Sequence, residues 1–456
     1  MRQSAWGFSI LKFVMWAGGI TLAGAWLFTD TIRTHLPRES SPNKLRFSHF
    51  GTYHDFLTWS ELIRAFEGRH PNISIKQEYV AGWYGLYDRK LRQQFLAGSE
   101  PHLALVQGIS FLAMANQFAE LPNQEQDPKC PLEPEKQDPL AVRMYQLQGI
   151  QKAMPVTGGN LLIYYNKKSF QRASTSRGDH VALPADDWTM DDFASTGLSL
   201  TCDFDGDGNL DQFGFWQPRW VYFLPFLWSF GANVLDPAGE HWLLSDEAAT
   251  AAFDFYKNMR VGPHRYAPHP HEISQLIQDV AFLTGRTAMC INGPWFIPLV
   301  NESELRNDYG VAHIPVCNGE RRTRVTWDGI AASKHLPAEE LRNALKFIAF
   351  VGSPEGQRIL TRSARALPAR ISERDWFIRT HPGEAPRRFV EALLYSQLEP
   401  QTNRFREIDR AIGRHLSAFL KPGNVSHASD FLLLLRDDPA IAQFTERLED
   451  SSVPAN

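Results

Sequence analysis

Short strand patterns alternate with amphipathic helix patterns in the first quarter of the chain. Apolar side chains alternate along 44–50, and strand-like runs recur at 73–79 and 103–106. Between them, helical spacing follows a Thr-x-x-Glu capping box at Thr58 and appears again over 86–97. Strands that are joined through helices usually run parallel in one sheet. The pattern therefore predicts a βαβαβ unit with a parallel sheet.

A second unit with its own strands and helices is predicted further along the chain. The length of 456 residues exceeds the usual size of one hydrophobic core, so we expect an α/β protein of two lobes. Further strands are expected at 160–166, 288–291, 309–316 and 325–332, and further helices at 187–193, 223–230, 247–259 and 341–351. The expected divisions are lobe I over 44–154, lobe II over 155–322, a return to lobe I over 323–365, and lobe II helices with a C-terminal tail over 366–456.

The N-terminal residues are typical of a secretion signal. Arg2 and Lys12 precede an uncharged stretch over 13–28, and a polar spacer follows over 31–43. As a helix the uncharged stretch measures about 24 Å, which is shorter than the roughly 30 Å hydrocarbon core of a membrane. We expect 1–30 to be a signal peptide or a membrane anchor, and the protein to be extracytoplasmic.

Charge and cysteine spacing exclude several classes of function. The formal net charge is -4 and no long Lys/Arg run occurs, so nucleic acid is not an expected partner. No Cys-x-x-Cys pair is present, which excludes a zinc ribbon, and a Cys290–Cys317 disulfide and free thiols both remain open. The sequence also lacks a nucleophile elbow, a zinc-protease helix and a phosphate loop, so no catalytic residue is predicted.

An acidic loop has the spacing of a calcium-binding loop. Four carboxylates occur over 203–211, where they would repel one another without a cation, and Gly208 stands at the sharp-turn position. Gly214 replaces the bidentate Glu that usually ends such loops, which predicts weak affinity. We expect a structural Ca²⁺ ion here. Its expected ligands are Asp203, Asp205, Asp207, Asn209 and Asp211.

One segment resembles a known family. Residues 282–295 read Phe-Leu-Thr-Gly-Arg-Thr-Ala-Met-Cys-Ile-Asn-Gly-Pro-Trp. This run is similar to the pattern of Phe, a spacer, Gly-Lys/Arg, Ala-Met and Gly-x-Trp in the extracellular solute-binding proteins that include maltose-binding and glycerol-phosphate-binding proteins. Other segments that are similar to the family, in the same order, are 82–84, 97–102, 164–167, 187–193 and 334–357.

The resemblance implies a fold, a ligand and a partner. It implies a two-lobed periplasmic-binding-protein-like fold whose lobes are joined by crossing strands, with a hinge and with the ligand in the cleft between the lobes. It also implies a monomer that delivers a carbohydrate or carbohydrate-derived solute to an ABC permease in the membrane. The lipid-bearing cysteine of many relatives is absent, and the loop over 51–55 does not reproduce the loop that grips maltose, so maltose itself is not implied.

Aromatic residues beside glycine are the first ligand-binding candidates. Trp295 follows Gly293 and Pro294, so its ring can project from a loop and stack on a sugar face, and the resemblance implies that the matching Trp contacts the ligand. The alternative is a structural role, in which the Trp295 side chain fills the core of its lobe. Trp83 and Tyr84, in a loop between two glycines, are the second aromatic candidates, and an ordinary surface turn is their alternative. Trp228 is a further candidate on a predicted helix face, where a tryptophan usually belongs to the core.

Polar residues near predicted strand ends complete the candidate set. The first strand is followed by 53–55, at the edge where open α/β sheets bind ligands. Asp328 stands beside Trp327, an arrangement that suits hydrogen bonding to sugar hydroxyls, although Asp328 would also suit a turn cap. The candidates from these segments, together with the arginine of the Leu-Pro-Ala-Arg segment at 367–370, are Tyr53, His54, Asp55, Trp327, Asp328 and Arg370.

Two alternatives compete with solute delivery. A glycoside-active enzyme would use a carboxylate pair such as Asp55 and Asp328 across the cleft. A sensor ectodomain, held by the N-terminal segment, would present bound solute to another protein and would have the same sequence features.

Overall fold

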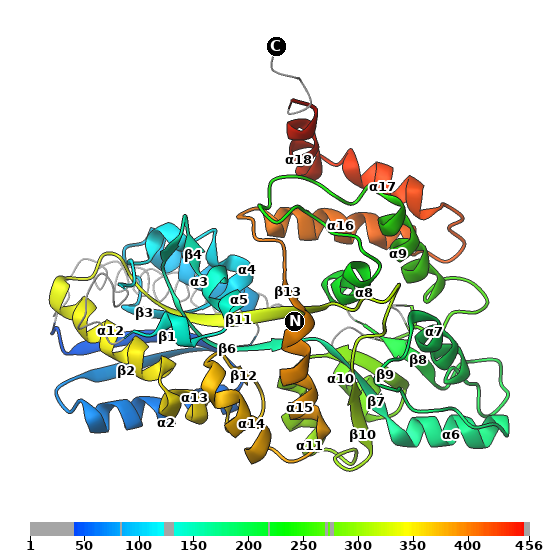
Figure 1. Cartoon of the computed structure of the whole chain (residues 1–456), viewed down its shortest axis with the longest axis horizontal. Coiled ribbons are helices and arrows are strands. Elements are labelled where there is room, and N and C mark those ends of the chain that lie inside the picture. Colours follow the sequence, from blue (N-terminus) through cyan, green and yellow to red (C-terminus); the bar gives the residue numbers. More distant parts are fainter. Residues whose placement is uncertain are drawn as a thin grey trace, which may run out of the picture.

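The computed structural model describes residues 41–450 apart from 83, 123–131, 218, 270–271 and 274–277 (Figure 1). The expected signal segment over 1–30 and most of the spacer over 31–43 lie outside the described residues. Within the described ranges, every helix is too short or too polar to cross a membrane.

Lobe I is built on a seven-stranded sheet. Its order is β2-β1-β3-β11-β6-β12, and β13 pairs with β11. β1 pairs in parallel with both β2 and β3, so the predicted βαβαβ unit is confirmed. The strands are β1 (Lys44–Gly51), β2 (Ser74–Ala81), β3 (Leu103–Gln107), β6 (Met154–Asn160), β11 (Thr323–Ala332), β12 (Leu367–Pro368) and β13 (Ser396–Leu398).

Helices cover both faces of this sheet and give lobe I two apolar cores. One core gathers the side chains of α2, α12 and the inner face of β1, and the other gathers those of α3, α4 and α5. The helices are α2 (Tyr53–Arg69), α3 (Tyr84–Leu96), α4 (Gly108–Phe111), α5 (Pro139–Met144), α12 (Ala338–Gly352) and α13 (Pro354–Thr361).

Lobe II has a four-stranded sheet of order β10-β7-β9-β8. A single large core joins this sheet to its surrounding helices and to the C-terminal helices. Its strands are β7 (Leu162–Asn166), β8 (Phe213–Trp216), β9 (Thr287–Asn292) and β10 (Tyr309–Ala312). Its helices include α6 (Lys167–Arg177), α7 (Met190–Ser199), α8 (Leu224–Ser229), α9 (Glu247–Asn258), α10 (Gln278–Leu283), α11 (Ile297–Asn301) and α15 (Glu384–Glu391).

The lobes are joined where β6 and β11 run side by side between them (Figure 1). β6 belongs to the large sheet and β7, which begins at Leu162, to the small one, so the chain passes from one sheet to the other at Leu161. It returns to the large sheet with β11, which begins at Thr323. The segment after 366 serves both lobes, because β12 pairs with β6 while Leu367 and Phe377 pack into the lobe II core.

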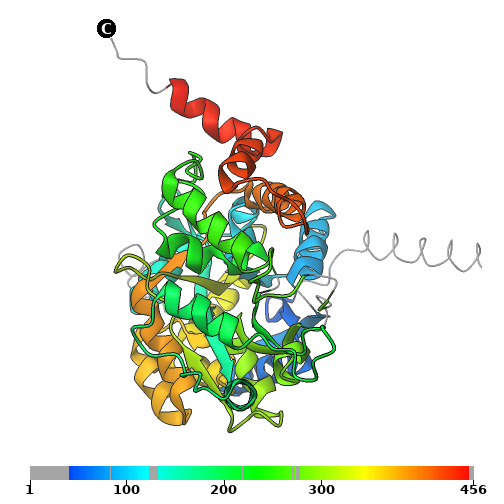
Figure 2. The ribbon, with the colours of Figure 1, turned by 90° about the vertical axis from the view of Figure 1, so that its right-hand side faces the viewer.

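The C-terminal helices project from one end of lobe II (Figure 2). α16 packs against α17 and α18, and α17 packs against α9. Their apolar side chains, such as Ile408, Leu416 and Phe431, belong to the lobe II core. These helices are α16 (Phe405–Phe419), α17 (Ala428–Arg436) and α18 (Pro439–Asp450). α14 (Arg374–Thr380) comes before them in the chain and lies at the opposite edge of the molecule in Figure 1.

The first helix of lobe I begins earlier than predicted. The Asp55 carboxylate accepts hydrogen bonds from the Thr52 backbone N–H at 2.6 Å and from the Thr52 hydroxyl at 2.9 Å. Both Thr52-x-x-Asp55 and Thr58-x-x-Glu61 have the form of a capping box, and the choice of the second was wrong. The earlier start adds helical hydrogen bonds, such as Phe56 N–H to Thr52 O at 3.2 Å, which the later start would leave unmade.

The cysteines that the structure describes are all free thiols. Cys202, Cys290 and Cys317 are buried and unbridged, so the disulfide between the last two is contradicted. Cys290 lies inside β9, where burial raises the pKa of its thiol well above the ordinary value. Cys130 lies outside the described residues.

Candidate ligand-binding site

Trp295 lies at the junction of the two lobes. It belongs to the 3₁₀ helix η5 (Pro294–Phe296), directly after β9, and its half-buried ring packs against the lobe II core. A Cβ atom built on Gly293 would come within 2.3 Å of this ring, and one built on Gly159 within 3.2 Å. Gly159 belongs to the crossing strand β6, so the ring rests against the connection between the lobes. The two glycines therefore leave the space in which the tryptophan ring lies.

Asp328 is the least satisfied carboxyl group at this junction. It pairs with Gln107 of β3 and Thr157 of β6, and the register of β11 shifts directly after it. Its Oδ1 atom is sealed from solvent and has no hydrogen-bond partner. Burial, followed by the nearby charge of Asp55, raises the pKa of Asp328 to about 7, while Arg365 acts in the opposite direction. A buried carboxyl oxygen without a donor is costly, which agrees with the raised pKa.

Asp55 interacts with other residues of lobe I. Its carboxylate forms an ion pair with Arg365, caps Thr52 and lies beside Gly51, where a Cβ would come within 2.3 Å of Oδ2. Arg365 also donates to the Thr52 hydroxyl at 2.8 Å. Asp55 therefore positions the start of α2 and lies near Asp328. The predicted loop over 53–55 is instead the first turn of this helix, in which Tyr53 is 65% exposed.

Lobe II contributes polar groups directly before the Trp295 segment. The Asn292 side-chain amide donates to Asp279 Oδ1 at 3.1 Å, and burial raises the pKa of Asp279. Asn292 ends β9, and Asp279 lies in the first turn of α10. Sequence reasoning missed this pair, although Asn292 stands inside the motif that carried the resemblance. Asp279 had no signal, because its position opposite Asn292 is created by the packing of α10 on β9.

Three other candidates are buried side chains. Trp327 is fully buried in a lobe I core, because neighbouring residues of a strand point to opposite faces and Asp328 occupies the other one. Trp228 is 4% exposed on α8, which packs against the crossing strand β11, and it lines a pocket of about 250 Å³ together with Gln397 of β13. Arg370 forms an ion pair with Glu133 at 2.8 Å and is 9% exposed. Trp327 therefore packs inside lobe I, and Arg370 joins two segments of lobe I through its ion pair.

The second aromatic candidate cannot be compared with the structure. Trp83 and the side chain of Tyr84 lie outside the described residues, and Tyr84 is placed only as the first residue of α3. His54 is exposed in the first turn of α2. These three residues stay candidates from the sequence alone.

The acidic loop brings three of its five expected ligands together. Oxygen atoms of Asp203, Asp205 and Asp211 lie within 4.8 Å of one another. The hydrogen bond from the Asp207 backbone acts to lower the pKa of Asp205, but the charge of Asp207, desolvation and the charge of Asp211 together raise it above its ordinary value. Asp207 instead accepts the Asn209 backbone N–H at 2.7 Å and its side-chain amide at 3.1 Å. Three converging carboxylates fit the oxygen ligands that Ca²⁺ prefers.

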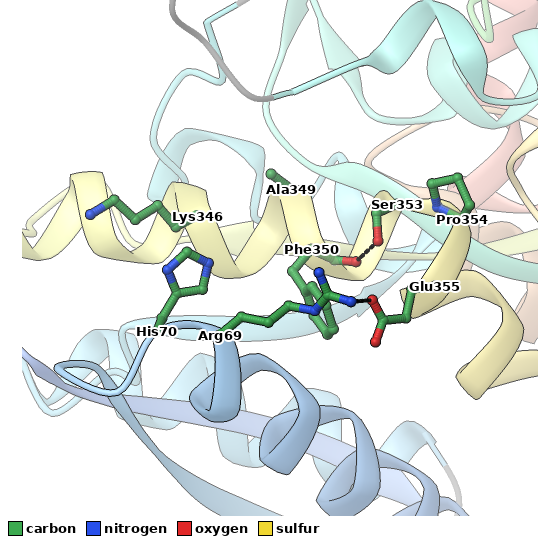
Figure 3. A pocket seen from close by; sticks show the side chains of 8 residues that line it. All are labelled: Arg69, His70, Lys346, Ala349, Phe350, Ser353, Pro354 and Glu355. Carbon is green, nitrogen blue, oxygen red and sulfur yellow. Dashed lines mark hydrogen bonds and ion pairs between the residues drawn. The ribbon is translucent and has the colours of Figure 1, made fainter.

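A pocket of about 490 Å³ lies on lobe I and contains no predicted site residue (Figure 3). It is bounded by the end of α2 at Arg69 and by the turn from α12 to α13, and Arg69 pairs there with Glu355. Arg69 lies in the last turn of α2, where a cation offsets the helix dipole, and Lys346 lies in the middle of α12. Burial, followed by the charges of Lys346 and Arg69, lowers the pKa of His70.

Comparison with solved structures confirms the predicted two-lobed α/β fold. The ABC substrate-binding protein of Listeria monocytogenes in complex with cycloalternan is 21% identical, with a TM-score of 0.74 over 87% of this chain and 97% of its own. A maltose-bound protein of T. maritima is 19% identical, with a TM-score of 0.70 over 90% and 99%. Mycobacterium tuberculosis UgpB in complex with glycerophosphocholine is 21% identical, with a TM-score of 0.71 over 90% and 100%.

Sequence comparison identifies the family. Binding proteins of Brucella abortus and Brucella suis are 24% identical over 326 residues, which cover 69% of this chain and 73% of theirs. Residues 51–358 match the family described as bacterial extracellular solute-binding protein, which confirms the resemblance seen around Trp295. This chain therefore belongs to the family of bacterial extracellular solute-binding proteins.

Proposed function

We propose that this protein binds a carbohydrate or carbohydrate-derived solute at the junction of its lobes and delivers it to an ABC permease. The observation that carries the proposal is the half-buried ring of Trp295, which lies against the crossing strand with polar groups of both lobes around the junction. An aromatic face with nearby hydrogen-bonding groups is the combination that recognises a sugar ring and its hydroxyls.

The polar groups have complementary tasks in this proposal. Asp328 is partly exposed as a residue, so its carboxyl group accepts a hydroxyl hydrogen of the solute on its accessible side. Asp279 and Asn292 form a second polar pair on the lobe II side. Because a buried acceptor without a donor is costly, a solute that supplies a donor to Asp328 gains affinity over one that does not.

Similar proteins support the chemical class. The solved structures with the same fold hold cycloalternan, maltose and glycerophosphocholine, which are sugars or a polyol derivative. Membership of an extracellular family agrees with the extracytoplasmic location expected from the N-terminal segment. We propose that the protein acts as a monomer and performs no covalent chemistry. Its N-terminal segment serves as a signal peptide or an anchor.

Calorimetry against neutral sugars, sugar phosphates and polyols tests the proposal. We expect one of these classes to bind, and Trp295→Ala to weaken its binding about threefold to tenfold, since stacking contributes roughly 0.5–1.5 kcal/mol beyond buried area. Trp376→Ala is the matched control, because this half-buried ring of α14 lies against Arg358 of α13 and against His381 at the end of α14. The absence of binding across the whole panel, or equal affinity in the wild type and in Trp295→Ala, would refute the proposed site.

We also propose a structural Ca²⁺ ion in the acidic loop. Support comes from the convergence of Asp203, Asp205 and Asp211, and from Gly206 and Gly208, whose positive φ angles of 76° and 89° let the backbone turn sharply around them. The proposed ion stabilises lobe II and takes no part in solute binding.

A further inference from the structure

An ionic contact connects α3 of lobe I to α16 of lobe II. The Asp88 carboxylate is fully buried and accepts Arg406 Nη2 at 2.7 Å and Arg92 Nε at 2.9 Å. The same Arg406 nitrogen donates to the Ser110 hydroxyl at 2.8 Å, and Ser110 is also buried. One guanidinium thus reaches a carboxylate and a hydroxyl that belong to two different helices. Hydrogen bonds between charged partners of this kind are stronger than those between neutral groups.

The two ends of this contact are anchored in different lobes. Tyr87 and Leu91, on either side of Asp88, belong to a lobe I core. Phe405 and Ile408, on either side of Arg406, belong to the lobe II core. Figures 1 and 2 show α16 next to the helices α3 and α4 of lobe I. The contact therefore depends on how the two lobes are placed relative to each other, because its two ends are fixed to different cores.

An apolar contact accompanies the ionic one. Ile109, the neighbour of Ser110 in α4, packs against the large core of lobe II as well as against the α3-side core of lobe I. Leu393, in the segment between α15 and β13, packs against the same two cores. The lobes therefore touch on this side through side chains, in addition to their connection through the crossing strands.

The first turns of α16 are held rigidly on lobe II. Asp409 accepts the Trp220 indole N–H at 2.7 Å and Arg219 Nη2 at 3.0 Å. Phe405 lies against Trp220 with ring centroids 6.4 Å apart. Because the backbone around Arg406 is fixed in this way, α16 cannot follow lobe I when the lobes separate. Separation has to break the contact with Asp88.

We propose that Arg406, Asp88 and Ser110 form an interlobe latch that stabilises the present arrangement of the lobes in the absence of solute. Asp88 keeps Arg92 when the latch opens, so the carboxylate is not left without a cation. Arg406 is 44% exposed, so solvent and salt weaken the latch, and we expect it to shift the equilibrium between lobe arrangements about fivefold. The latch adjusts the apparent affinity for a solute by changing the fraction of protein in the competent arrangement.

Spin labels on the solute-free protein measure this equilibrium directly. Leu96 at the end of α3 and Val425 after α16 are 89% and 90% exposed, so cysteines there can carry the labels without disturbing a core. In Arg406→Gln we expect the population of a second interspin distance to rise about fivefold relative to wild type. Arg410→Gln is the matched control, because Arg410 lies one turn further on α16 and, among the residues that the structure describes, donates to Arg406 O of the same helix. Equal distance distributions in these two variants would overturn the latch.

A second variant and salt separate the latch from loss of fold. Asp88→Asn alone should give the same shift, and combining it with Arg406→Gln should add little, because both changes remove one interaction. Sodium chloride at 1 M should move the wild type toward the Arg406→Gln distribution. Near-ultraviolet circular dichroism is recorded on every variant, and Ser110→Ala replaces Asp88→Asn if the latter unfolds. Additive shifts in the double variant, or no effect of salt, would contradict a direct latch. No solute is used, so the result does not depend on the proposed sugar site.

Discussion

Asp328→Asn tests the unusual electrostatics of the lobe junction. The carboxyl group is sealed at Oδ1, and its pKa is raised from the ordinary 3.8 to about 7 by burial and by the charge of Asp55. Asparagine has nearly the same shape as the protonated acid and carries no charge. The substitution therefore removes the cost of ionisation and keeps the packing of β11 between its neighbours.

The sign and size of the effect follow from the pKa change. Because the folded-state pKa is raised, the folded protein binds a proton that the unfolded chain releases between pH 3.8 and about 7. The free energy of unfolding of the wild type therefore falls as pH rises through this window and levels off above it. At roughly 1.36 kcal/mol per pKa unit the full effect would be about 4 kcal/mol, and partial exposure of Asp328 reduces our expectation to about 2 kcal/mol.

Urea unfolding followed by tryptophan fluorescence measures this difference. We expect Asp328→Asn to gain about 2 kcal/mol over the wild type when the pH is raised from 4.5 to 8. Asp187→Asn, at an exposed position of lobe II, is the matched control and should show a much smaller change with pH. A difference between Asp328→Asn and the wild type that is the same at both pH values would refute the reasoning.

Three other predictions follow from single features of the structure. Millimolar Ca²⁺ should raise the free energy of unfolding of the wild type, but not of Asp205→Ala, by up to about 2.7 kcal/mol at a hundredfold excess over Kd, and the melting temperature should rise with it; a melting temperature that a chelator leaves unchanged would exclude the ion. Thr52→Ala should lower the free energy of unfolding by about 1 kcal/mol and Thr58→Ala by less than about 0.5 kcal/mol, and the reverse order in urea unfolding would contradict the helix start seen here. Gly159→Ala should weaken solute binding in calorimetry, because its Cβ would lie 2.7 Å from the proline of η5, whereas Gly68→Ala, at an exposed position of α2 with no atom within 4 Å of the added Cβ, should not; equal affinities would exclude this packing role.

Local sequence patterns predicted the elements more reliably than their ends. The parallel β1, β2 and β3 were predicted because alternation and helical spacing depend only on neighbouring residues. The same reasoning failed at the start of α2, since two segments of the chain satisfy the capping-box pattern equally well. β6 had no strand signal in the sequence, because Met154–Asn160 contains one proline and two glycines, which weaken a strand pattern. Only its pairing with β11 shows that it belongs to the lobe I sheet.

The junction shows what local patterns omit. Trp295 was predicted because glycine and proline beside a strand end indicate a projecting ring, and the structure places it against the crossing strand. Arg365 and Asp279 carried no such signal. Each acquires its place from a partner far along the chain, as when Arg365 meets Asp55 or Arg406 meets Asp88.

The sequence by itself determined the α/β class, the motif of the solute-binding family and the positions of most strands and helices, because these depend on side-chain order over a few turns. The tertiary structure decided which of two neighbours, Trp327 or Asp328, faces the junction, because alternation in a strand does not say which face is inside. It also decided which charges meet across the lobes. Such contacts arise only when the two cores are packed beside each other, and no spacing within the chain specifies them.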